Sequence, residues 1–173
     1  MTNQSEDART ANPGILKIIG VGQSLRGDDA AGLEAVRLWQ EIYQPKHDHP
    51  NIRVELAELP GIGLLSLLEG SRAAILVDAV HGGAEPGTIY QAGEEQISAF
   101  GSGSASAHGW GVAETLRLGH QLMPSSMPDR LVLIGIEAGQ LALGERLSPA
   151  VQSALPEAIK LIEQVVLDEL ARS

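Results

Sequence analysis

The chain contains no cysteine, which excludes thiol catalysis, disulfide bonds and thiolate metal sites and fits the cytoplasmic location that we expect. Aromatic residues make up only 3% of the sequence, too few for a base-stacking surface. Basic residues are also scarce, 12 against 22 acidic ones, and the net charge of -10 argues against attraction to nucleic acid or anionic lipid. No apolar run approaches the roughly 18 residues that would suggest a membrane span.

What is present is a regular alternation of short apolar segments with helical patterns. Residues 14–22, 52–59, 72–80 and 130–138 are predicted strands, and residues 88–91 a short antiparallel edge strand. Helices are predicted from about residue 29, over 61–70 and 109–121, and from Ser148 to the end of the chain. We therefore expect an α/β fold: one three-layer αβα domain over residues 15–173, with a mostly parallel, twisted sheet of about five strands. Residues 1–14 are predicted to be a flexible N-terminal segment.

Polar residues follow several of these strands where each one ends. They are Asp28 and Asp29 after the first strand, Glu58 at the end of the second, Asp78 and His81 at the third, and His108 after a loop of small residues. In such folds ligands bind at the carboxyl ends of the strands. Structural explanations exist for each residue, because aspartates cap helix N-termini and a loop histidine is common. Histidines 47 and 49 are expected in a solvated loop.

The first loop, "GVGQSLRGDDAAG", has glycines spaced like those of a phosphate-binding loop. Asp28 and Asp29 stand where that motif needs a lysine and a hydroxyl, so the loop would repel a phosphate. Two aspartates and a histidine suit a divalent metal such as zinc or nickel, and three ligands leave coordination positions open. From the residues alone we predict a small α/β domain with an oxygen-and-nitrogen cation site, in which His81 competes with His108 as the ligand.

Four segments in this order resemble a known family. They are the first loop, then "AAILVDAVHGGAEPGT", then "SASAHGWGVAETL", and finally "LVLIGIEAGQLALGERLSPAVQSALPEAI". Each segment alone is weak evidence, but their order and spacing together are specific. The similarity covers about residues 15–166. The chain resembles the hydrogenase maturation endopeptidases, which trim the C-terminus of the large subunit of nickel-iron hydrogenases.

The resemblance implies that Asp29, Asp78 and His108 contact the metal and carry catalysis. Our own hypothesis adds that Glu58 or Asp28 assists proton transfer. The resemblance also implies that the nickel is supplied by the hydrogenase large-subunit precursor, with no organic cofactor. The sequence departs from the family at Gln23 and at "ELPGIG", where many relatives have D-G-G. We expect a monomer. The alternatives are a non-catalytic nickel-binding assembly chaperone and, from a third class, a nucleotide-binding module.

Overall fold

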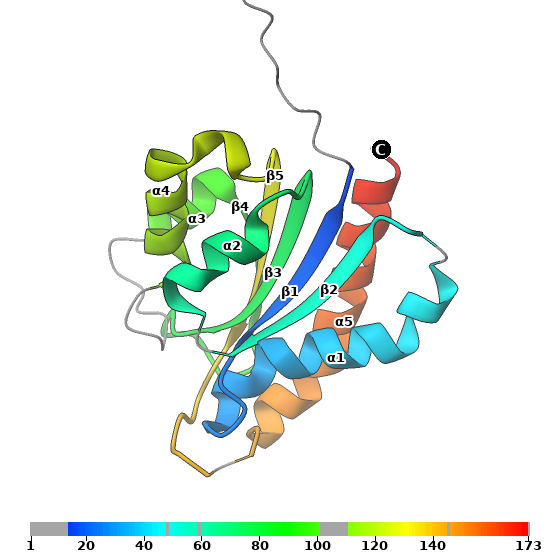
Figure 1. Cartoon of the computed structure of the whole chain (residues 1–173). Coiled ribbons are helices and arrows are strands. Elements are labelled where there is room, and N and C mark those ends of the chain that lie inside the picture. The colour runs from blue at the N-terminus through cyan, green and yellow to red at the C-terminus, as the bar shows by residue number, and fades with distance from the viewer. Residues whose placement is uncertain (1–13, 48, 59, 101–110, 145, 173) are drawn as a thin grey trace, which may run out of the picture.

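The computed structural model describes residues 14–47, 49–58, 60–100, 111–144 and 146–172, without the side chains of 98–100. Its five-stranded sheet has the order β2-β1-β3-β5-β4 (Figure 1). Four strands run parallel: β1 (Leu16–Gly22), β2 (Ile52–Glu58), β3 (Ala73–Val80) and β5 (Arg130–Glu137). The edge strand β4 (Ile89–Gly93) is antiparallel to β5. The predicted sheet, including its antiparallel edge, is confirmed.

Helices cover both faces of the sheet (Figure 1). The core on one face contains side chains of α1 (Ala31–Ile42) and α5 (Pro149–Leu170). The core on the other face contains side chains of α2 (Leu64–Leu68), α3 (Glu94–Phe100) and α4 (Val112–Leu122). Short 3-10 helices lie at η1 (Gly27–Ala30), η2 (Gln44–Lys46), η3 (Gly61–Gly63) and η4 (Pro124–Ser126). The three-layer αβα prediction is confirmed.

The sequence pattern explains which strands are central. In β3 the run "AAILVDAV" is buried along nearly its whole length, as expected of a parallel strand covered on both faces. β2 has exposed residues among its buried ones and lies at the sheet edge. β1 and β3 are therefore neighbours at the centre of the sheet, and their loops meet at one edge.

The helix predictions differ from the structure mainly at the ends. The helix expected from about residue 29 begins at Ala31, because Asp29 lies in η1. α3 was not predicted; its sequence "EEQISAF" is short, and Ile97 is buried against the sheet. Ser148 caps α5 as expected, accepting a hydrogen bond from the backbone N–H of Val151 at 3.4 Å.

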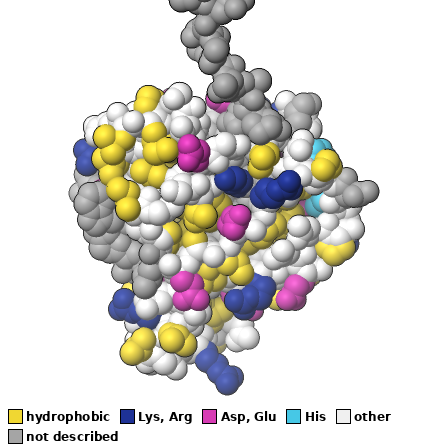
Figure 2. Space-filling model, in the orientation of Figure 1, with side chains coloured by type: hydrophobic (Ala, Val, Ile, Leu, Met, Phe, Trp, Pro, Cys, Tyr) yellow, Lys and Arg dark blue, Asp and Glu magenta, His cyan; other side chains and the backbone are white. Residues whose placement is uncertain are grey.

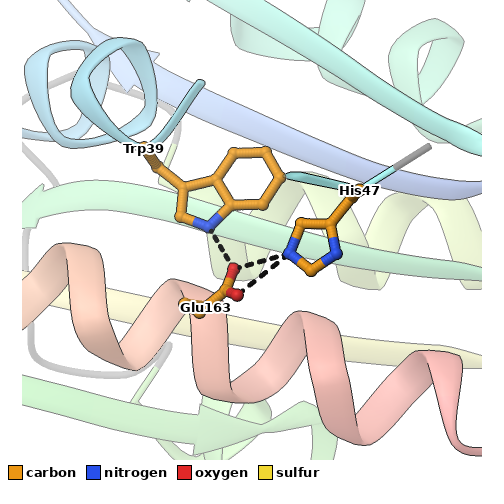
Figure 3. Close-up of polar contacts among 3 residues, drawn as sticks. All are labelled: Trp39, His47 and Glu163. Carbon is orange, nitrogen blue, oxygen red and sulfur yellow. Dashed lines mark hydrogen bonds and ion pairs between the residues drawn. The ribbon is translucent and has the colours of Figure 1, made fainter. Parts of the chain in front are cut away.

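One polar cluster ties α1 to α5. The indole Nε1 of Trp39 donates to Glu163 at 3.0 Å, and His47 Nε2 contacts both carboxylate oxygens of Glu163 at 2.9 and 3.0 Å (Figure 3). The Trp39 and His47 rings stack with their centroids 6.1 Å apart. The side chain of His47 is only 12% exposed, so the expectation of a solvated loop histidine is wrong. Its contacts give it a structural role between two helices.

Acidic and basic side chains are interspersed on the face drawn in Figure 2, with no extended region of a single sign. Among the described helices, none is both long enough and apolar enough to cross a membrane.

Candidate functional site

The loop after β1 is held close to the sheet by two glycines. A Cβ atom at Gly32 would overlap the carbonyl oxygens of Val21 in β1 and Val77 in β3. Gly27 has a φ of +56°, a left-handed conformation that favours glycine. The absence of a side chain at Gly32 lets the N-terminal turn of α1 rest on both central strands. The aspartates just before that turn are thereby brought to the ends of β1 and β3.

Asp28 is fully buried and joins this loop to the loop between β5 and α5. Its Oδ2 accepts hydrogen bonds from the backbone N–H groups of Gly139 and Gln140 at 2.8 and 3.0 Å. Ser148 donates its backbone N–H to Oδ1 at 2.6 Å and its hydroxyl to Oδ2 at 2.9 Å. Four donors thus surround one carboxylate. These contacts give Asp28 a structural role, and its part in proton transfer stays a prediction.

Asp29 and Asp78 are the buried pair of the site, 0% and 1% exposed. Gly20 of β1 pairs in register with Val77 of β3, the residue before Asp78. Burial is the main reason that the pKa of Asp78 rises from 3.8 to about 8, and the negative charge of Asp29 raises it further; a backbone hydrogen bond from Ala79 opposes the shift. Within the described part of the chain, Asp78 Oδ1 has no hydrogen-bond partner.

Glu58 lies at the end of β2, opposite Gly22 in the register of β1 and β2. It is exposed, and its Oε1 accepts a hydrogen bond from the hydroxyl of Ser24 at 2.9 Å. The backbone N–H of Ser24 also donates to Oε2, at 3.4 Å. The carboxylate of the second strand therefore contacts the loop that carries the two aspartates, as the strand-end reasoning expected.

Of the two candidate histidines, His108 lies outside the described residues. His81 directly follows β3, and its buried Nε2 has no hydrogen-bond partner among the residues that the structure describes. No group of three or more histidine, aspartate or glutamate side chains that could hold a metal is found in that same part of the chain. The predicted three-residue metal set stays a prediction, with Asp29 in η1 and Asp78 near the end of β3.

Glu137, at the end of β5, was missed by the sequence analysis. It is 2% exposed and accepts hydrogen bonds from the N–H groups of Gly82 and Gly83, all at 2.9 Å, and from the Tyr90 hydroxyl at 3.1 Å. Partial burial, together with this contact to Glu137, raises the pKa of Tyr90. The sequence does contain a feature that could have identified Glu137 as a candidate: an acidic residue ends the apolar run "LVLIGIE", just as Asp78 interrupts β3. Glu137 anchors the turn that follows His81.

Buried carboxylates at the ends of adjacent parallel strands define this as an α/β protein with a candidate cation-contacting site. A buried carboxyl with an unpaired oxygen gains from a cation, which would restore its ionised form. Carboxylate oxygens are also suitable ligands for zinc and, with imidazole, for nickel. The donor types therefore fit a divalent metal.

Comparison with known proteins gives the family. Residues 36–165 match the model of the family described as HycI, hydrogenase maturation protease. The hydrogenase expression/formation protein HupD of Rhodobacter capsulatus is 32% identical over 150 residues, covering 85% of this chain and 69% of the relative. HupD of Bradyrhizobium diazoefficiens is 27% identical over 170 residues, covering 97% and 83%. The chain belongs to the hydrogenase maturation protease family, as the sequence motifs indicated.

Solved structures share the fold. The hydrogenase maturating endopeptidase HybD from E. coli superposes with a TM-score of 0.78 at 22% identity, over 89% of this chain and 93% of that one. A hydrogenase maturation protease HycI from Thermococcus kodakarensis superposes with a TM-score of 0.65 at 22% identity, over 88% and 92%. The architecture extends across nearly the whole of each neighbour.

Proposed function

We propose that this protein is a cytoplasmic endopeptidase that removes the C-terminal extension of a nickel-loaded nickel-iron hydrogenase large-subunit precursor. Family membership supports proteolysis in hydrogenase maturation. The single structural observation that carries the proposal is the buried pair Asp29 and Asp78, placed where β1 and β3 end. The nickel belongs to the substrate, and the pair meets it when the precursor docks.

The chemistry of Asp78 suits recognition of a metal that arrives from outside. With a pKa of about 8, its carboxyl is mostly protonated at neutral pH in the protein alone. A bound cation favours the ionised form, so docking of a metal-loaded precursor releases a proton from the site. A precursor without nickel supplies no positive charge to compensate for ionisation of the buried Asp78. Discrimination between loaded and empty precursors follows from this difference.

The proposed division of work places Asp29, Asp78 and His108 on the metal, which orients the backbone at the cleavage site and polarises the scissile carbonyl or a water. Glu58 is the better placed of the two candidates for proton transfer. It is exposed and holds Ser24 in the loop beside the aspartates. Asp28, with four hydrogen-bond donors around its carboxylate, keeps that loop in position.

The test is to mix the purified protein with the candidate precursor, prepared with and without nickel, and to weigh the products by mass spectrometry. We expect a single C-terminal truncation in the nickel-loaded sample alone. A stable complex with a proven partner precursor and no loss of mass would instead establish the nickel-binding chaperone. Equal cleavage of both precursor samples would overturn the proposed role of nickel but would still support the protease activity.

A further inference from the structure

A cavity of 170 Å³ opens beside Asp78, between the sheet and the helices α3 and α4. Its wall is mostly apolar and includes Ala92 of β4, Ile97 of α3, Leu133 of β5 and Ala113 of α4. The cavity therefore connects the candidate metal-contacting carboxylate with a pocket built from four different elements.

Small residues create this space. Ala92 and Ala113 have only a methyl group each, and Gly135 of β5 has none; a Cβ there would lie 3.0 Å from Val80 Cγ1, also in the wall. The space is open to the surface on one side and lies next to a buried carboxylate, so a side chain from another molecule can enter it.

The size and polarity of the cavity identify the class of occupant. Pockets for small-molecule ligands typically measure about 300–1,000 Å³, so this cavity is too small for one. An apolar cavity of about 150 Å³ accommodates a benzene molecule, which is the size of one large apolar side chain. Glu114 also lines the wall, so an acidic side chain would be repelled.

The polar part of the wall is fixed in place. Glu137 holds the N–H groups of Gly82 and Gly83 and the hydroxyl of Tyr90, and both Gly82 and Tyr90 line the cavity. His81 lines it too, and its Nε2 is buried without a hydrogen-bond partner in the described ranges. A preformed wall of this kind selects an occupant by shape without first having to become ordered.

We propose that this cavity is a specificity subsite that receives one apolar side chain of the hydrogenase precursor, from a residue close to the scissile bond. The inference rests on the proposed function and adds the residue class that the site selects. Insertion of the side chain beside Asp78 would place the neighbouring peptide bond at the two aspartates. The subsite thus couples recognition of the precursor sequence to recognition of its metal.

The test uses the nickel-loaded precursor of the organism's own hydrogenase large subunit, in which each residue within about four positions of the scissile bond is replaced in turn by Ala and by Asp. We measure kcat/KM for each precursor by mass spectrometry. At one apolar position, Ala should lower kcat/KM roughly tenfold or more, and Asp should lower it further. Equal rates for the whole series would overturn the subsite while leaving the protease intact.

Two variants of the protein fill the cavity, Ala92→Leu in β4 and Ala113→Leu at the second position of α4. Ala92 is 4% exposed, so its added side chain cannot turn out to solvent. We expect each variant to process the natural precursor at least tenfold more slowly than the wild-type protein does. Each variant should also process the Ala-substituted precursor at least as fast as it processes the natural precursor. General damage to the fold would lower kcat/KM for both precursors alike. An equal loss of kcat/KM for both precursors, in variants that fold normally, would therefore contradict the proposal.

Ala150→Leu is the matched control, because Ala150 is exposed at the second position of α5 and lies outside the cavity wall. It should leave the precursor preference unchanged. Circular dichroism and the urea midpoint check that all three variants are folded. If the wild-type protein cleaves no precursor at all, the proposed function fails and the subsite with it. If both filling variants keep the wild-type preference for the natural over the Ala-substituted precursor, the subsite alone is overturned.

Discussion

Replacing Asp78 by Asn should abolish a large part of the pH dependence of stability. In the folded protein the pKa of Asp78 is about 8, against 3.8 for the ordinary group. Between these values the folded state binds a proton that the unfolded chain has released, so stability falls as the pH rises and levels off above about pH 8. At about 1.4 kcal/mol per pKa unit, the loss from pH 5 to pH 8 is about 3–4 kcal/mol.

The assay is urea unfolding of the metal-free wild type and of Asp78→Asn at several values between pH 5 and pH 8. The free energy of unfolding of the variant relative to wild type should rise by about 3–4 kcal/mol across this range, because Asn carries no titrating proton. Asp168→Asn makes the same change at an exposed position of α5 and should keep the wild-type profile. Parallel curves for wild type and Asp78→Asn would refute the idea that burial holds this carboxyl in its protonated form.

Three other changes test the site. Gly32→Ala should destabilise the protein by about 1–3 kcal/mol or more in urea unfolding, since its methyl group would overlap two strand carbonyls; wild-type stability would show that the helix can move aside. Asp28→Ala should cost about 3 kcal/mol or more in the same assay, because it removes a buried carboxylate with four donors, and a stable variant that cannot cleave would instead assign Asp28 to the chemistry. His108→Ala should abolish precursor processing in a mass assay while circular dichroism shows a normal fold; normal cleavage by that variant would remove His108 from the site.

The sheet and its loops could be predicted because each strand has a local sequence signature. The continuous apolar runs of β1, β3 and β5 are typical of strands buried on both faces. The rule that ligands bind at the carboxyl ends of parallel strands drew attention to Asp29, Asp78 and Glu58; of these, Glu58 contacts Ser24 of the loop after β1. β4 was recognisable from its short length between turns. None of these inferences required knowledge of long-range side-chain contacts.

What could not be predicted depends on contacts between distant parts of the chain. Glu137 is 55 residues from Gly82, and nothing local indicates that its carboxylate binds that turn. The contact of His47 with Glu163 spans 116 residues, which is why a loop histidine next to charged residues was expected to be solvated. α3 escaped prediction because seven residues with one buried isoleucine give no clear helical period.

The adjacent aspartates show how neighbouring identical residues acquire different roles. Asp28 accepts four hydrogen bonds from Gly139, Gln140 and Ser148 in the β5–α5 loop. Asp29, one residue further along η1, is equally buried, and its charge raises the pKa of Asp78. Ionisation of Asp78 beside Asp29 costs repulsion energy, and a cation that attracts both carboxylates would offset that cost. The first aspartate therefore fixes the loop, and under the proposed function the second contacts the metal of the precursor together with Asp78.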